Sequence, residues 1–391
     1  MYQRTAKAAL RGLNGPVSSV GNSCIKQFST TSRQNLRALP TQTENAKLNE
    51  ILNVIQDKII LPAYLPQKQR RIVFNPKKKG YLSQNPIDIE VEGHEHRFQT
   101  LNCHKDIPDA RKKLYDAIDT MESKEDWANV GTILWGYRKA GVRLNQRAYD
   151  KIIRLACDSG NVGMVIGCLK QAHLTGMWIT EREQVIRIVN AINARWDGSL
   201  EQAKQSSSWV RTLVDIIQRP ENAEQVSKAI EKRQLADSGL GMSPHFSVLG
   251  RTAMLQTRAV TIQAKTQAEE SVEDDLVALK DDLATVQTLW APQLKEGKAL
   301  AENAELAQAR PQRQASFSLN GSEYVKSLAW SIRGIRTSQQ VAEEAAAPLL
   351  PLVDSLEQYA REFIESEAGN EARAEQWTKC FEEALDLKSS S

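Results

Sequence analysis

The chain has 391 residues, 41% hydrophobic and 25% charged, a composition typical of globular proteins with a substantial core. No apolar run reaches the ~18 residues of a membrane-spanning helix, so no transmembrane segment is expected. The five cysteines are irregularly spaced, without a C-x-x-C pair, which argues against a disulfide framework or zinc knuckle. The net charge of +3 divides into +7 over residues 44–260 and −10 over residues 261–391, with the remaining +6 before them. We therefore expect the front of the chain, rather than its back, to approach polyanions.

Residues 1–36 have the composition of a mitochondrial transit peptide. Six Lys or Arg precede the first acidic residue, Glu44, and Arg4, Lys7 and Arg11 fall on one face of a short helix. No apolar core of a secretory signal follows the basic start. We predict import into the mitochondrial matrix, with cleavage between residues 28 and 40; a basic tail without a targeting role is the alternative.

Residues 37–107 form the next predicted segment. Apolar spacing predicts a helix over 45–60, which Pro62 and Pro66 end. Residues 67–81 are basic and contain Pro76 and Gly80, so we expect them to be extended rather than helical. Alternating apolar and acidic residues over 87–92 predict a short strand.

A 35-residue offset appears in the next part of the chain, 108–237. Gly141 recurs as Gly176, and Val130 recurs as Val165. The clearer copy predicts helices at 146–158 and 161–174 with a break at Ser159-Gly160, and a third, eroded copy starts near residue 181. Repeats of this length indicate stacked helical hairpins, and the two glycines suit the left-handed position that ends a helix. An ordinary helical bundle is the alternative.

The copy around residues 146–180 resembles a pentatricopeptide repeat. The stretches Ala148-Tyr149-Asp150-Lys151-Ile152-Ile153, Asp158-Ser159-Gly160-Asn161-Val162 and Leu174-Thr175-Gly176-Met177 carry the resemblance. It implies an α-solenoid of helical hairpins, in which one residue of the first helix and the last residue of the repeat face an RNA base. The positions that the resemblance implies are Tyr115 with Asn145, and Asp150 with Thr180.

The C-terminal part is predicted to be an acidic helical domain over 251–391, after a Gly/Ser/Pro-rich linker over 238–250. Further helices are expected at 208–218, 221–237, 322–347 and 352–385. An apolar seam with 4-3 spacing comprises Val272, Leu276, Leu279, Leu283, Val286 and Trp290. Because this seam is under three heptads long, it favours a helical hairpin over a free coiled coil. The predicted fold class is mainly α: repeat hairpins, then a helical hairpin or bundle, with a short extended or β segment before the repeats.

Enzyme signatures are missing from the sequence. It has no P-loop, dinucleotide-binding, H-E-x-x-H or G-x-S-x-G motif. His94, His96, Cys103 and His104 are the one group that suggests a metal, but their spacing fits no common zinc module. We therefore expect a protein without catalytic activity, cofactor or metal.

The basic segment 67–81 is the predicted RNA-binding element. Cations on an extended backbone follow a phosphate chain, and aromatic rings stack on bases; the candidates are Lys68, Arg70, Arg71, Phe74, Lys77, Lys78, Lys79 and Tyr81. A solvated surface loop is the alternative. With the transit peptide, this predicts a factor in organellar gene expression, associated with the mitoribosome or an mRNA, whose partners are rRNA or mRNA and mitochondrial proteins. A scaffold or assembly factor for a respiratory complex is the alternative function.

Overall fold

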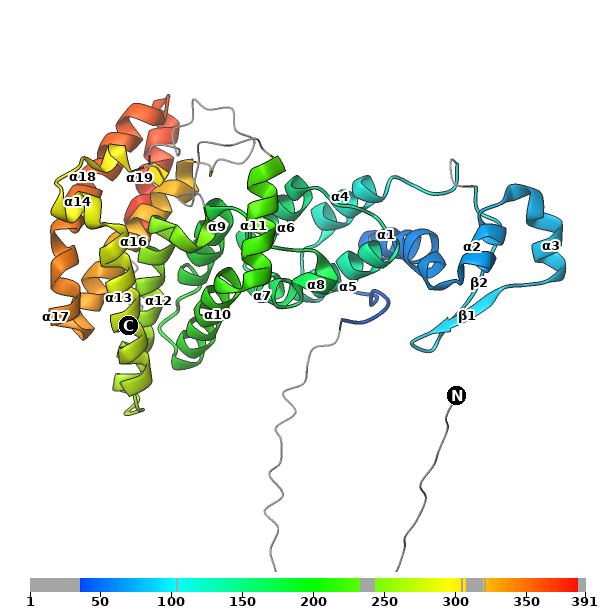
Figure 1. Ribbon diagram of the computed structural model, residues 1–391, viewed down its shortest axis with the longest axis horizontal. Coiled ribbons are helices and arrows are strands. Elements are labelled where there is room, and N and C mark those ends of the chain that lie inside the picture. The colour runs from blue at the N-terminus through cyan, green and yellow to red at the C-terminus, as the bar shows by residue number, and fades with distance from the viewer. Residues whose placement is uncertain are drawn as a thin grey trace, which may run out of the picture. The chain divides into compact units, whose positions relative to one another are not determined.

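The computed structural model describes residues 36–102, 105–232, 243–303, 305, 306, 319 and 321–385. These residues are mainly helical, with one small antiparallel sheet, as the sequence predicts (Figure 1). The predicted transit peptide, except Leu36, lies outside them. So do Cys103, His104 and residues 238–242 of the predicted linker. None of the helices described is long and apolar enough to cross a bilayer.

The described chain begins with a helical segment that buries one apolar face. Helix α1 (Ala46–Ile55) continues into a π-helical turn, η1 (Gln56–Ile60), and a 3-10 turn, η2 (Leu61–Tyr64). Asn45 caps α1 by accepting a hydrogen bond from the Leu48 amide at 3.1 Å. Leu48, Leu52 and Ile55 are buried, so the helix predicted over 45–60 is confirmed.

The predicted extended conformation of residues 67–81 is wrong. The segment forms α2 (Gln67–Val73), a 3-10 turn η3 (Pro76–Lys78) and α3 (Lys79–Gln84). Pro66 precedes the first turn of α2, and Pro76 occupies the first turn of η3, where a missing amide hydrogen costs no intrahelical bond. The prolines therefore start these helices rather than break them.

A β-hairpin follows the basic helices. Strand β1 (Asp88–Val91) pairs antiparallel with β2 (His94–Arg97), which confirms the predicted strand. The turn uses Glu92 and Gly93, both with positive φ. Beyond the hairpin, the Leu101 amide donates to the Val73 carbonyl at 2.8 Å, which ties the hairpin to α2.

Three helical hairpins follow in series. The first helices begin at Ala110, Gln146 and Arg182, so successive starts are 36 residues apart, close to the offset seen in the sequence. First helices pack against first helices, and second helices against second helices. The hairpins are α4 (Ala110–Thr120) with α5 (Lys124–Lys139), α6 (Gln146–Asp158) with α7 (Val162–Lys170) and the short α8 (Ala172–Thr175), and α9 (Arg182–Asn193) with α10 (Leu200–Gln218).

The repeat positions behave largely as the sequence predicts. Gly141 and Gly176 have φ of 79° and 77°, the left-handed conformation expected at these positions. Ile153, Val165 and Leu169 are buried, whereas Tyr149 is only partly buried. Helix α11 (Pro220–Lys232) then packs against α10.

The remaining helices surround a central pair. Helix α12 (Val248–Gln267) packs along α16 (Gly321–Val341) and also contacts α9 and α10 (Figure 1). Residues 248–250 of the predicted linker are therefore the first turn of a buried helix. The other elements are η5 (Pro244–Phe246), α13 (Glu273–Leu289), α14 (Ala291–Lys295), η6 (Leu300–Glu302), α17 (Glu343–Ala346), η7 (Ala347–Leu349), α18 (Leu350–Glu367) and α19 (Glu371–Leu385).

Candidate nucleic-acid interface

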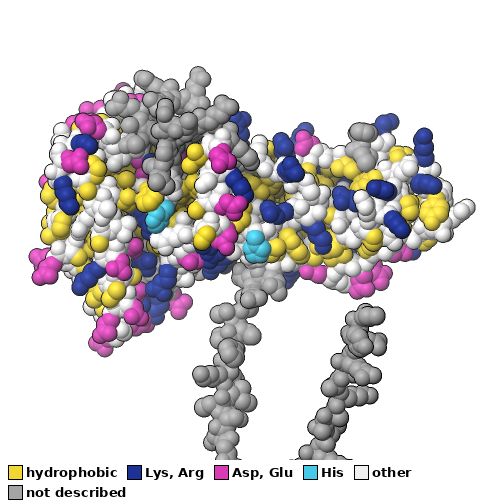
Figure 2. Space-filling model, viewed as in Figure 1, with side chains coloured by type: hydrophobic (Ala, Val, Ile, Leu, Met, Phe, Trp, Pro, Cys, Tyr) yellow, Lys and Arg dark blue, Asp and Glu magenta, His cyan; other side chains and the backbone are white. Residues whose placement is uncertain are grey.

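Among the described residues, a group of positive charges without ion-pair partners lies on α2, η3 and α3, which we call the basic helices (residues 67–84). They contain six Lys or Arg and no acidic residue. None of the six forms an ion pair with another described residue. Five are exposed and Arg70 is half-buried. In Figure 2, several Lys and Arg side chains stand among apolar and other polar ones at the end of the molecule where α2 and α3 lie in Figure 1.

Apolar side chains hold the basic helices in place and direct the charges outward. Val73 at the end of α2 and Leu82 in α3 are buried in the same hydrophobic cluster as Val91 and Phe98 of the hairpin segment. Asn75 caps η3, because its side-chain oxygen accepts from the Lys77 amide at 3.1 Å. The cations are thus carried on a folded support rather than on a free strand.

The two aromatic side chains of the basic helices differ in accessibility. Phe74 is half-buried, and the Arg70 guanidinium lies 5.8 Å from its ring centroid. Tyr81 is 50% exposed, and the Lys78 ammonium lies 5.8 Å from its ring centroid. Tyr81 therefore offers a surface on which a base can stack, whereas Phe74 mainly supports Arg70.

Of the four residues that the resemblance implies to face bases, two line one surface hollow. Asn145 and Thr180 both line a surface hollow of about 660 Å³, together with Arg143, Trp178 and Lys228. Asn145 also caps α6 by accepting from the Ala148 amide at 3.1 Å. This hollow is cationic and aromatic, and Tyr115 and Asp150, the other two residues that the resemblance implies, are not among those that line it.

Tyr115 and Asp150 are held by contacts within the protein. The Lys151 ammonium lies 4.7 Å from the Tyr115 ring centroid. The Asp150 carboxylate accepts from the Gln184 side chain at 2.6 Å, and the same glutamine accepts from the Thr180 amide at 2.9 Å. Asp150 therefore links α6 to α9, a role that the sequence alone did not indicate.

The residues that could bind a metal in the structure differ in part from those that the sequence suggests. His94 and His96 lie on one face of β2, as expected for H-x-H on a strand, and Cys103 and His104 are outside the described residues. Asp57 joins the two histidines instead. It lies 37 residues before His94, so no local spacing in the sequence could have identified it.

The sequence matches a known family over most of its length. Residues 26–382 match the family described as "Mitochondrial ribosomal protein mS27". A relative from Neurospora crassa, named "Small ribosomal subunit protein mS27", is 28% identical over 239 residues. That alignment covers 60% of this chain and 60% of the relative.

Proposed function

Because the chain belongs to the mitochondrial ribosomal protein mS27 family, we propose that it is a non-catalytic component of the mitochondrial small ribosomal subunit. The observation that carries this proposal is the family match over residues 26–382. The name of the Neurospora relative supports it, and so does the presequence-like composition of residues 1–36. Family membership favours the ribosome over the respiratory-complex scaffold that the sequence left open.

Within that role, we propose that the basic helices contact ribosomal RNA through its phosphates. Six cations without an ion pair among the described residues supply the counterion-releasing contacts that dominate RNA affinity. The helices present these charges over a surface rather than along an extended strand. Double-stranded RNA is recognised mainly through its backbone and its shape. We therefore expect duplex rRNA to be the partner of this surface, with Tyr81 adding stacking only where a base is unpaired.

Repeat hairpins of the pentatricopeptide type remain part of the proposal. The serial packing of α4, α6 and α9 and the 36-residue spacing support such a solenoid. Asp150 is engaged with Gln184, and Tyr115 lies under Lys151, so these hairpins are poorly suited to reading a sequence base by base. We propose that they act as a rigid surface for rRNA and neighbouring ribosomal proteins.

The test replaces all six cations by glutamine and measures RNA affinity against salt. Every phosphate that is no longer neutralised should reduce the slope of log affinity against log salt by about 0.7 to 0.9. The slope should therefore flatten and binding should weaken. Co-sedimentation with the small subunit should fall in parallel. The substituted residues are Lys68, Arg70, Arg71, Lys77, Lys78 and Lys79.

A matched control removes the same charge from elsewhere on the surface. It also replaces six cations by glutamine, but each of these is paired with an acidic side chain, so RNA binding should change little. The control residues are Lys204, Arg219, Lys298, Arg336, Arg361 and Lys379. Equal weakening in the two variants would show that only net charge matters and would contradict a specific role for the basic helices.

A further inference from the structure

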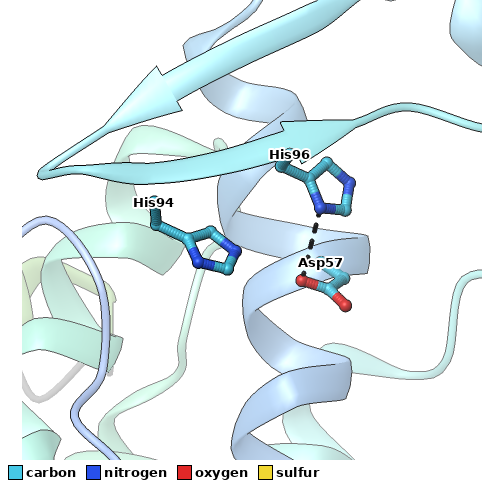
Figure 3. A group of neighbouring side chains, drawn as sticks. All are labelled: Asp57, His94 and His96. Atoms are coloured by element: carbon cyan, nitrogen blue, oxygen red, sulfur yellow. Dashed lines mark ion pairs between the residues drawn. The ribbon is translucent and has the colours of Figure 1, made fainter.

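Three potential metal ligands from distant parts of the chain meet beside the hairpin. His94 and His96 project from the same face of β2 toward the helical turn that carries Asp57 (Figure 3). One ligand atom from each residue lies within 4.8 Å of the other two. The His96 Nδ1 and Asp57 Oδ1 atoms are 3.8 Å apart. Two imidazoles and one carboxylate are a ligand set typical of zinc.

The backbone around Asp57 is unusual. Residues Gln56–Ile60 form a π-helical turn between α1 and η2. Such turns are rare, and single turns of this kind occur frequently at functional sites. The preceding residue, Gln56, is buried, and its Nε2 lies 3.2 Å from the His94 Nε2. The amide nitrogen donates and the His94 Nε2 accepts, so this contact positions the ring in the metal-free chain.

The hairpin fixes the positions of both histidines. In the sheet register, His94 is opposite Val91 and His96 is opposite Ile89. The Phe98 ring packs edge-on against the His96 ring, with centroids 4.7 Å apart. Val91 and Phe98 are buried, so the strand that carries the histidines is anchored to the core.

We propose that Asp57, His94 and His96 bind one Zn²⁺ ion, with water completing the coordination. Ligand atoms at about 2.1 Å from a tetrahedral ion are about 3.4 Å apart. The atoms now lie within 4.8 Å of one another, so they need to approach by at most about 1.4 Å. His96 is 20% exposed and Asp57 is 45% exposed, and His94 is exposed as well. These side chains can therefore rotate without disturbing the core.

The ion closes a loop that contains the basic helices. Asp57 precedes α2, and the two histidines follow α3, so the Zn²⁺ joins the two ends of the segment that carries all six cations. Because the three ligands meet only in the folded chain, the binding energy of the ion is available for folding. Any effect of the ion on RNA binding rests on the proposed function, whereas the metal site itself does not.

The test uses the full chain, stripped with a chelator and dialysed against Zn²⁺, with bound zinc counted per chain. Asp57→Asn and His96→Gln are each expected to weaken Zn²⁺ binding by at least about 100-fold, since even partners outside the ligand shell cost 10- to 100-fold. Glu95→Gln, on the opposite face of the same strand, and His173→Gln, on α8, are matched controls that should bind Zn²⁺ like the original chain. Hydrogen exchange of residues 67–84 should slow when Zn²⁺ is added to the original chain, and not in Asp57→Asn.

Two results would overturn the metal site. If the original chain, Asp57→Asn and His96→Gln bind Zn²⁺ equally, the ion is held elsewhere. If the stripped original chain takes up no Zn²⁺, Asp57 and His96 form an ion pair and not a metal site. Matching circular dichroism of the metal-free proteins shows that the variants fold, so weaker zinc binding is not a loss of structure. RNA binding of the metal-free chain and of the six-glutamine variant is measured in parallel, so that failure of the metal site is distinguishable from failure of the RNA interface.

Discussion

Glu305 is a buried carboxylate that holds two parts of the chain together. It accepts hydrogen bonds from the Ser247 hydroxyl at 2.8 Å and from the Val248 amide at 2.6 Å, at the start of α12. The Arg182 guanidinium, from the start of α9, lies 3.7 Å away. Burial raises the pKa of Glu305, while Arg182 and the two hydrogen bonds oppose that rise. Because the charge is buried, it is stable only with these partners in place.

A neighbouring carboxyl makes the stability of the fold depend on pH. Burial raises the pKa of Glu183 from its ordinary 4.5 to about 7, and the nearby carboxylates of Glu181 and Glu305 add to the rise. Below about pH 4.5, Glu183 is protonated in both the folded and the unfolded chain. Between 4.5 and 7 the folded chain holds the proton more tightly, so the free energy of unfolding falls as pH rises, and the decline is complete above about 7.

Glu183→Gln is therefore expected to stabilise the protein at pH 8, by up to about 3 kcal/mol, and to flatten the dependence between pH 4.5 and 7. Urea unfolding at several pH values measures both effects. Glu365→Gln, at an exposed position on α18, is the control that should leave the dependence unchanged. A Glu183→Gln variant with the original pH dependence would contradict a raised pKa.

At the scale of elements, sequence patterns predict helices well where burial is one-sided and poorly where it is not. The apolar face of α18, Val353 to Ile364, is buried as expected, because one stripe of a surface helix faces the core. Helix α12 has no such stripe, since 16 of its 20 residues are buried, among them Arg251, Thr257 and Arg258. Its polar groups find partners that no local pattern reveals: Thr257 donates to the Asn193 side chain at 2.6 Å, and Arg258 pairs with Asp282 at 3.0 Å.

The candidate site is predictable in composition but not in conformation. Charge and the lack of acidic neighbours are enough to identify the six cations of the basic helices. Their helical structure is harder to predict, because Pro66 and Pro76 are compatible with a helix only at its start, which is where both lie. Asp57 has no local signal, because its contact with His96 forms only when the hairpin folds back onto the π turn.

The packing of α12 against α16 depends on a glycine. A Cβ added at Gly334 would lie 2.9 Å from the Gln256 amide nitrogen and 3.0 Å from the Thr252 carbonyl oxygen. Both are backbone atoms of α12, so neither can rotate away, and the helices would have to separate. Gly334→Ala is therefore expected to lower the free energy of unfolding by about 1–3 kcal/mol, which a urea titration measures.

Gly167→Ala in α7 is the matched control for this change. No atom lies within 4 Å of a Cβ built there, and alanine favours a helix interior over glycine by about 0.5–1 kcal/mol. The control should therefore be neutral or slightly stabilising in the same urea titration. Similar effects of the two substitutions would contradict a close approach of α12 and α16 at Gly334.

At the scale of the whole molecule, the charge is divided but the core is not. Residues 44–260 carry +7 and residues 261–391 carry −10, which favours RNA contact through the first part and protein contact through the second. The hydrophobic core nevertheless runs through both, and the described residues from Leu36 onward belong to one compact unit. Helix α12 joins the repeat hairpins to the C-terminal helices, because it packs on α9 and α10 as well as on α16.

This continuity predicts which helices unfold together. Asn193 of α9 donates to the Ala253 carbonyl of α12 at 2.9 Å, and Thr261 of α12 donates to the Ala203 carbonyl of α10 at 3.2 Å. These buried bonds couple α9 and α10 to the C-terminal helices. Helices α1 and α4 lie at the other, N-terminal end of the series of hairpins and can open first. In hydrogen exchange at increasing urea, the amides of α9, α10, α12 and α16 should therefore lose protection together.

Asn193→Ala sharpens this experiment, because it removes both its bond to Ala253 and its bond to Thr257. It should lower the urea concentration at which all four helices open by the same amount, since they form one cooperative unit. Asn161→Ala, in the surface turn before α7, is the control that should leave their opening unchanged. If α9 and α10 open with α4 to α7 while α12 and α16 stay protected, the cooperative boundary lies at the predicted 238–250 linker, and the coupling through α12 is too weak to join the two parts.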